Sequence, residues 1–146
     1  MMLAAILSLA LFESTRPATE CDPGSSALVV RVVGLEVATG FLNVNLFDRP
    51  VGFPMEPERA WRRRRVAVRA EALVVAFECV PDGDYAVAVC HDANANEDCD
   101  KNVFGVPTES VGVSNDVSVR LRAPTFEEAR FIVGADPTRI TIDLDD

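Results

Sequence analysis

Short runs of alternating side chains, separated by turn residues, constrain the fold of this chain more than any other feature. Residues 41–47, 73–79 and 85–89 each place apolar side chains at every second position. Successive side chains of a β-strand point to opposite faces, so these runs predict strands that turn one face toward a core. Short strands with closely spaced turns are typical of an antiparallel sandwich or barrel.

The predicted fold is an all-β antiparallel sandwich of about seven strands with one short helix. The helix is expected near residues 125–130, with Thr125 as its N-cap and acidic side chains in its first turn. Strands are expected within residues 28–33, 40–47, 66–68, 73–79, 85–89, 117–121 and 139–144. The parity of these runs predicts a core that contains Val30, Val32, Leu42, Val44, Val75, Phe77, Tyr85, Val87 and Val119.

One turn carries a more specific signal. Residues 80–84 separate two of the predicted strands, and Tyr85 follows Gly83 by two positions. In sandwich domains a tyrosine at such a position folds back so that its hydroxyl bonds the turn backbone. We therefore expect Tyr85 to have a structural role.

The length and the charge of the chain limit what it can be. A chain of 146 residues fits one domain with its own core. The net charge of -9, from 23 acidic and 14 basic residues, repels phosphate backbones, so nucleic acid is not an expected partner. Within residues 80–109 Lys101 is the only basic residue among seven acids, and a field of that sign attracts cations.

The first residues predict export. Met1–Phe12 is apolar except for Ser8, which matches the apolar region of a signal peptide and is too short to cross a bilayer comfortably. We expect a leader in residues 1–20, a periplasmic or secreted protein with one sandwich over residues 27–145, and no membrane segment after leader removal. Two features count against a leader, because no Lys or Arg precedes the run and residues 15–20 lack a small-x-small cleavage site. The alternatives are a packed N-terminal strand or helix and a lipid anchor at Cys21.

The four cysteines suggest two disulfides in an exported protein, with three possible pairings. Because Cys90 and Cys99 flank one acidic loop at short separation, we favour a bond between them, which leaves Cys21 to pair with Cys79. Buried free thiols are the alternative. A zinc site is disfavoured, since the chain has one histidine and no C-x-x-C pair.

Four consecutive arginines follow Trp61. Residues 62–65 could bind an anionic lipid or polysaccharide, but they precede the alternating Val66 and Val68 of a predicted strand. Charged side chains commonly protect an exposed strand edge. A solvated surface run is therefore the favoured interpretation.

One loop carries metal-binding chemistry in its spacing. Calcium takes six to eight oxygen ligands, and a tight loop can supply them from alternate positions. Glu97 and Val103 depart from the helix-loop-helix calcium pattern, which has Gly and Glu at those positions. The alternative is a loop of Asx turns that bond their own backbone without a metal. The candidate ligands are Asp92, Asn94, Asn96, Asp98 and Asp100, with Glu109 as a further carboxylate if its segment folds back.

A hydrolase-like alternative would use His91 as general base, oriented by Asp92 or Glu109, with Ser110, Ser114 or a free cysteine as nucleophile. The chain has no Gly-x-Ser-x-Gly elbow and no dinucleotide fingerprint. We therefore favour a binding or structural module of the cell envelope, with an envelope protein or a glycan as its partner and Ca²⁺ as its one candidate cofactor. A sandwich that presents loops at one end is a common scaffold for such a module.

Four linked motifs make the chain similar to a known family over roughly residues 28–144. They are Val80-Pro81-x-Gly83-x-Tyr85-Ala86, His91-Asp92-x-Asn94-x-Asn96-x-x-x-Asp100, Phe104-Gly105-x-Pro107-x-Glu109-x-x-Gly112-x-Ser114-Asn115 and Ala123-Pro124-x-Phe126-x-x-Ala129. In order and spacing they resemble the bacterial family called domain of unknown function 2141. The resemblance implies an exported prealbumin-like or immunoglobulin-like sandwich and implies no reaction.

The chain departs from the family pattern in its candidate metal loop. Glu97 replaces the usual glycine after the second loop asparagine, and Cys90 and Cys99 are additions to the pattern. A disulfide between these two cysteines would hold the loop in shape where glycine or a cation does so in the family.

Overall fold

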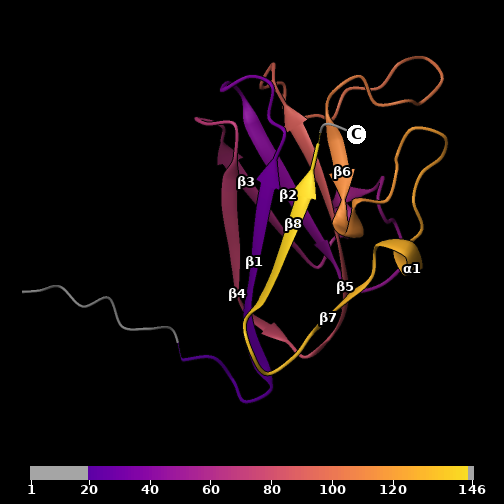
Figure 1. The fold of residues 1–146 in the computed structure, drawn as a ribbon. Coiled ribbons are helices and arrows are strands. Elements are labelled where there is room, and N and C mark those ends of the chain that lie inside the picture. Colours follow the sequence, from indigo (N-terminus) through magenta and orange to yellow (C-terminus); the bar gives the residue numbers. More distant parts are fainter. Residues whose placement is uncertain (1–19, 145–146) are drawn as a thin grey trace, which may run out of the picture.

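The computed structural model describes residues 20–144, so the predicted leader lies outside the described residues except for Glu20. The described part is mostly strand, with one short α-helix and two 3-10 turns. Figure 1 shows the arrangement of these elements. The strands are β1 (Ser25–Val33), β2 (Phe41–Phe47), β3 (Arg62–Ala67), β4 (Leu73–Pro81), β5 (Gly83–Asp92), β6 (Val111–Val113), β7 (Phe131–Val133) and β8 (Thr138–Asp143). The helix α1 is Phe126–Ala129, and the turns are η1 (Pro57–Arg59) and η2 (Ser114–Asp116).

The strands form two sheets that pack as a sandwich. The three-stranded sheet has the order β4-β1-β8, and the five-stranded sheet has the order β3-β2-β5-β6. Its fifth strand, β7, pairs with the first residues of β5, whereas β6 pairs with residues further along that strand. The fold class predicted from the sequence is confirmed at the level of a β-sandwich, and the finer prealbumin-like or immunoglobulin-like assignment stays a prediction.

One strand pair corrects the expected antiparallel arrangement. β1 and β8 run parallel, with Leu28 opposite Thr138 and Val32 opposite Ile142. Parallel neighbours need a long crossover connection, and here almost the whole domain lies between the two strands. The alternation of apolar side chains contains no information about strand direction, so the sequence could not reveal this pair.

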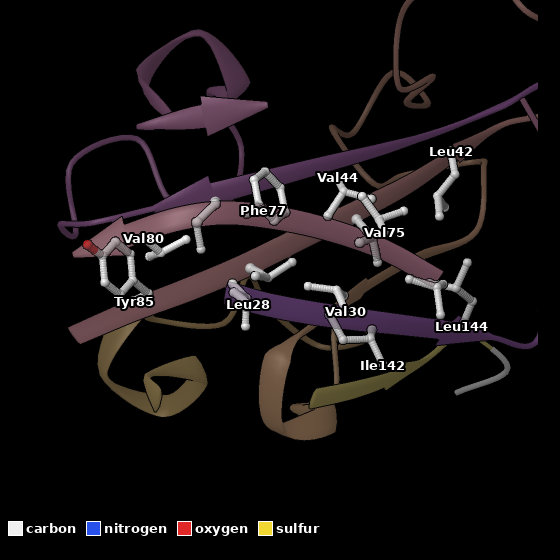
Figure 2. Close-up of a cluster of buried hydrophobic side chains, with 14 of the residues drawn as sticks. Leu28, Val30, Leu42, Val44, Val75, Phe77, Val80, Tyr85, Ile142 and Leu144 are labelled. Atoms are coloured by element: carbon white, nitrogen blue, oxygen red, sulfur yellow. The ribbon is translucent and has the colours of Figure 1, made fainter. Parts of the chain in front are cut away.

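The core lies between the two sheets (Figure 2). Eight of the nine predicted core residues are buried there, including Phe77 and Val44, which have no exposed surface. Val119 is only partly buried, and it packs in a second, smaller cluster outside the sandwich interior. The core also contains residues that the sequence analysis did not single out, among them Leu28, Leu35, Val80 and Ile142.

The predicted strand at residues 117–121 is wrong. These residues form a loop, and the Leu121 side chain is 97% exposed. A strand needs a free neighbouring edge, and the edge of β5 is occupied by β6 and β7. Those two strands have only three residues each, too short for a recognisable alternation.

The turn between β4 and β5 forms the expected tyrosine corner. The Tyr85 hydroxyl donates a hydrogen bond of 3.0 Å to the Pro81 carbonyl. Its ring lies 5.7 Å from that of Trp61, and the guanidinium of Arg62 stacks over this indole. Arg62 also donates to the carbonyls of Glu78 and Cys79, which links β3 to β4 at one open side of the sandwich.

No helix in the described range 20–144 is long and apolar enough to cross a membrane.

The predicted helix is present, and its first residue is preceded by a complete capping box. The Thr125 hydroxyl accepts from the Glu128 backbone N–H, and the Glu128 carboxylate accepts from the Thr125 N–H. This reciprocal cap allows a helix of one turn to form, because it satisfies two otherwise unpaired donors.

The interior position of Phe77 gives a stability prediction. Phe77→Ala is expected to reduce the free energy of unfolding by about 3–5 kcal/mol, because it removes a fully buried ring and leaves a cavity. Val74 lies on the same strand but is 63% exposed, so Val74→Ala serves as the matched control with a change of about 0.5 kcal/mol or less. Urea unfolding measures both, and equal losses in the two variants would contradict the assigned core.

Candidate functional site

The outer face of the five-stranded sheet, turned away from the main core, is where the unusual side chains gather. In β2 the side chains of Leu42, Val44 and Leu46 enter the core, so Asn43 and Asn45 point to the opposite face. Strand register then fixes two rows across this outer face. One row is Arg63, Asn45, Ala88 and Val113, and the next is Arg65, Asn43, Cys90 and Val111.

The end of this face near α1 is closed by a second apolar cluster. Phe53 contacts Phe47 and Phe126 edge to face, with ring centroids 5.3 and 5.9 Å apart. The buried Ser114 hydroxyl donates to the Ala129 carbonyl at 2.6 Å and accepts from the Val87 N–H at 3.0 Å. These bonds attach α1 to β5, and they fix both ends of the loop at residues 117–125.

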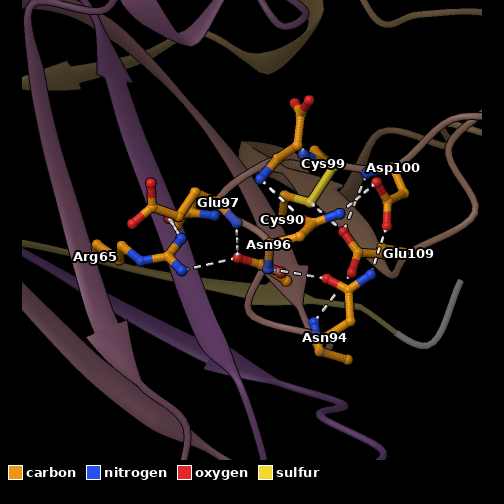
Figure 3. Close-up of a disulfide and its surroundings, with 12 residues drawn as sticks. Arg65, Cys90, Asn94, Asn96, Glu97, Cys99, Asp100 and Glu109 are labelled. Carbon is orange, nitrogen blue, oxygen red and sulfur yellow. Dashed lines mark hydrogen bonds and ion pairs between the residues drawn. A yellow bond between two sulfur atoms is a disulfide. The ribbon is translucent and has the colours of Figure 1, made fainter.

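The opposite end carries the disulfide-bonded loop at residues 93–110 (Figure 3). The structure contains the bonds Cys90–Cys99 and Cys21–Cys79, which is the pairing that the sequence favoured. The Asp92 carboxylate begins the loop and has no exposed surface.

Three donors surround this buried carboxylate. Arg65 donates to Asp92 at 2.9 Å, and the backbone N–H groups of Asn96 and Glu97 donate at 3.1 and 3.0 Å. Burial by itself raises the pKa of Asp92, but the bonds from Arg65, Glu97 and Asn96 outweigh it and hold that pKa below its usual value. The Arg65 guanidinium also stacks over Phe41 at 4.1 Å, so its position is fixed from two sides.

Four of the predicted metal ligands contact one another in the same loop. The amides of Asn94 and Asn96 donate to the two oxygens of Asp100 at 2.7 and 2.8 Å. Glu109 folds back to the loop, which was the condition for its inclusion as a candidate ligand, and accepts from the Asp100 N–H at 3.1 Å and from the Ala93 N–H at 3.1 Å. The Asn94 and Asn96 oxygens also accept backbone N–H groups two residues further along.

The loop is therefore closed by its own donors, in the pattern of the Asx-turn alternative. Asp98 accepts only from the next residue, Cys99, at 3.1 Å. A cation at Asp100 would require Asn94 and Asn96 to turn their amide oxygens toward it in place of their N–H groups. Calcium binding by this loop stays a prediction.

Among the described residues, the side chain of the candidate base in the hydrolase alternative is engaged by a backbone carbonyl and not by a candidate nucleophile. His91 is 3% exposed, and its Nε2 atom lies 2.8 Å from the Thr39 carbonyl. Because neighbouring strand residues face opposite ways, His91 lies on the core side of β5, whereas Asp92 lies on the outer side. The Ser114 hydroxyl is engaged with backbone groups, and both disulfides together use all four cysteines.

Between the two closed ends of the outer face lies a cleft of ≈ 610 Å³. Three loops form its walls, residues 49–57, 93–110 and 117–125, and the latter two project from the same side of the sandwich in Figure 1. Its lining combines basic and apolar side chains with two acids, Glu97 and Asp98. The side chains that define it are Asn45, Arg63, Lys101, Arg120, Ala88, Val111, Val113, Val119 and Leu121.

Several polar side chains of this cleft have no hydrogen-bond or ion-pair partner in the described part of the chain. Asn45 is 7% exposed, and its side chain makes no hydrogen bond to any residue in the described range. Every fully buried side-chain N or O atom there has a partner, so the Asn45 amide must reach the open space of the cleft. Among the described residues, the side chains of Arg63, Lys101 and Arg120 also lack ion pairs, unlike Arg65.

Sequence reasoning found the disulfide-bonded loop but not the cleft. The four arginines were interpreted as one surface run, yet strand parity divides them between two faces. Arg62 and Arg64 lie over Trp61 and Phe77, and Arg64 also reaches the cleft that Arg63 and Arg65 line. One sequence signal could have revealed the cleft. Arg63 and Arg65 share one parity in their strand, and Asn43 and Asn45 share one parity in the neighbouring strand, so all four side chains point to the same face.

A family model described as "Uncharacterized protein conserved in bacteria (DUF2141)" matches residues 30–141, and the chain belongs to that family. The matched range contains the whole cleft and the disulfide-bonded loop. Comparisons with curated proteins and with solved structures gave no match.

The buried ion pair predicts a pH-dependent stability. The pKa of Asp92 is lower in the folded than in the unfolded chain, so its stabilisation is complete at neutral pH and is lost as the pH falls through the folded-state pKa. At pH 7 Asp92→Asn is expected to lower the free energy of unfolding by about 1.5–3 kcal/mol. The difference from the native chain should shrink once the pH falls below the usual aspartate pKa of about 3.9.

Urea unfolding at several pH values between 7 and 2 measures this difference. Glu97→Gln is the matched control, because the Glu97 side chain is exposed and its interaction with Asp92 runs through the backbone N–H. The control should behave as the native chain at every pH. A constant difference between native and Asp92→Asn proteins down to pH 2 would contradict the ion-pair assignment.

Proposed function

We propose that this member of the DUF2141 family is an exported binding module of the bacterial cell envelope whose cleft takes a negatively charged ligand. The observation that carries the proposal is a set of cationic side chains without ion pairs, Arg63, Lys101 and Arg120, around the unpartnered amide of Asn45. The proposed site is built on strands β2, β3 and β5, which makes its floor rigid.

The overall charge of the chain makes this arrangement informative. A protein of net charge -9 offers many carboxylates that could neutralise a surface arginine, as Asp92 and Glu128 do for Arg65 and Arg122. A concave site with low-dielectric walls concentrates the field of its own charges. An anion of small size is therefore attracted locally, while a long polyanion such as nucleic acid is repelled by the molecule as a whole.

The chemistry of the lining also bears on the partner. Neutral sugars are usually held by stacking on aromatic rings, but no Phe, Tyr or Trp within residues 20–144 lines the cleft. Guanidinium and amide donors instead match carboxylate, sulfate or phosphate oxygens. Among envelope partners, a group that carries such an anion fits better than a neutral glycan.

Export is supported by the cysteines. Disulfides persist in oxidising compartments such as the periplasm and are rare in the reducing cytosol. The two bonds involve every cysteine of the chain, and one of them holds a wall of the cleft. A periplasmic or secreted location follows from that chemistry as part of the proposal.

A second candidate function is calcium binding by the disulfide-bonded loop. The observation that favours it is that the Asn94 and Asn96 amides both bond the Asp100 carboxylate, while the Glu109 carboxylate accepts from the Asp100 backbone N–H, so two carboxylates and two amides gather in one loop. Hard cations prefer such oxygen ligands.

The anion proposal predicts a localised response to inorganic phosphate. Phosphate replaces chloride at constant ionic strength while ¹H–¹⁵N NMR spectra are recorded. The side-chain amide of Asn45 and the backbone amide of Arg63 should shift and saturate. Arg63→Gln should weaken the binding by roughly tenfold or more, since one charge-assisted hydrogen bond contributes about 1.5 kcal/mol or more.

Arg31→Gln is the matched control, because Arg31 is exposed on β1 in the other sheet and the substitution changes the net charge equally. The control should bind phosphate as the native chain does. Small shifts spread evenly over both sheets, with equal affinities in the two variants, would reject the cleft as an anion site.

The calcium candidate predicts a change in thermal stability. A cation that binds only the folded chain adds ~2.7 kcal/mol at about 100 times its dissociation constant, so millimolar calcium should raise the melting midpoint above that in chelator. Asp100→Asn should abolish the increase, whereas Asp136→Asn, outside the loop, should leave it intact. Identical melting curves of the native chain in calcium and chelator would assign the loop to self-bonded Asx turns alone.

A further inference from the structure

We propose that the ligand of the cleft is an amphipathic anion, a single alkyl or acyl chain that ends in a carboxylate or phosphate. This inference rests on the proposed function and names its substrate class. It follows from the division of the cleft into a basic side and an apolar side along one row of the sheet.

The basic side offers one free charge at floor level. Arg63 and Asn45 are direct neighbours in the register of β3 and β2, so their side chains stand beside each other on the outer face. In the next row Arg65 is engaged by Asp92 and Asn43, which leaves Arg63 as the unpaired guanidinium of the floor. A guanidinium with an adjacent amide donor suits the several oxygens of one carboxylate or phosphate head group.

The apolar side continues the same row. Ala88 and Val113 follow Asn45 across β5 and β6, and both belong to the second apolar cluster, so the row ends at the edge of that cluster. Adjacent strands lie about 4.8 Å apart, so the row from Arg63 to Val113 spans roughly 14 Å. That span is long enough for a head group at one end and a short hydrocarbon chain at the other.

The loop walls supply further apolar surface over this end. Val106 is 50% exposed and Leu121 is 97% exposed, and both line the cleft from opposite loops. Val111 and Val119 are partly buried beside them. A hydrocarbon chain along this side would cover these side chains, and each buried methylene would strengthen binding.

The same lining disfavours a ligand with many charges. Glu97 and Asp98 also line the cleft, from the disulfide-bonded loop. A polyanion that extended beyond Arg63 would meet these carboxylates, whereas a single head group need not. One charge with an apolar chain therefore matches the lining better than a string of charges.

The test compares ethyl, butyl, hexyl and octyl phosphate with inorganic phosphate, each below the concentration at which micelles form. NMR shifts of the Asn45 side chain and of Val113 report whether the head and the chain occupy the cleft. We expect the affinity to rise by up to roughly fourfold for each buried methylene. Octyltrimethylammonium, with the same chain and the opposite charge, should not bind.

Two variants separate the contributions of head and chain. Arg63→Gln should weaken the binding of octyl phosphate about tenfold or more, and it should leave the dependence of affinity on alkyl chain length unchanged. Leu121→Ser should reduce the dependence on chain length, and its side chain is almost fully exposed, so the fold is not at risk. Val74→Ser, an exposed apolar residue of the other sheet, and Arg31→Gln are the matched controls and should bind as the native chain.

The outcomes distinguish this inference from the proposed function. Equal affinity for octyl phosphate and inorganic phosphate in the cleft would overturn the amphipathic ligand and leave the anion site standing. No localised shifts with any of these compounds would overturn both. Vesicles of phosphatidylglycerol provide a further test. Binding to vesicles without binding to monomeric octyl phosphate would overturn the proposed site in the cleft, and would assign the contact to the exposed loop tips at Val103, Phe104 and Leu121.

Discussion

The burial of β5 on both faces is the constraint on which the rest of this structure depends. From Tyr85 to Asp92 every residue of the strand is buried. Side chains of one parity fill the sandwich interior, and those of the other parity support the outer face. The strand therefore needs cover on both sides, which the three-stranded sheet provides inside and α1 with the loops provides outside.

The outer side of β5 carries small side chains, and this choice shapes the cleft. Ala86 leaves room for the rings of Phe47 and Phe126, so the sheet is closed near α1. Ala88, one position further along the same face, lies on the floor of the cleft. A larger residue there would fill the space between Asn45 and Val113, because these are its direct neighbours in the register. The small size of Ala88 thus helps to keep the floor of the cleft open, on a strand that is otherwise fully packed.

The parts of the fold that the sequence predicts are those governed by local chemistry. Parity places Val44 and Phe77 in the core, the turn chemistry places the Tyr85 hydroxyl on Pro81, and the capping residues start α1 at Phe126. Whether Val117–Leu121 pairs with a neighbour depends on an edge that β6 and β7 occupy, and no local pattern contains that information.

The same division applies to the site. The sequence identifies the oxygen-rich loop because its residues are close together in the chain, whereas the fold-back of Glu109 to that loop is a feature that only the structure shows. The cleft cannot be predicted from local sequence patterns, because it joins Arg63, Asn45 and the tip of a loop near residue 120, which lie far apart in the sequence. Strand register brings the first two together, and the bonds of Ser114 to Val87 and Ala129 position the loop.

The two unusual features of the molecule, its acidic loop and its basic cleft, depend on each other electrostatically. Asp92, Asp100 and Glu109 accept hydrogen bonds from donors within the loop or at its base, so these carboxylates are directed inward and away from Arg63. The Cys90–Cys99 bond closes the loop and shortens the range over which its acids could move toward the cleft. Free carboxylates on a flexible wall would instead reach the cationic side chains and neutralise them. Self-bonding thus withdraws Asp92, Asp100 and Glu109 from the cleft, whose acidic lining among the described residues is limited to Glu97 and Asp98 of the same loop.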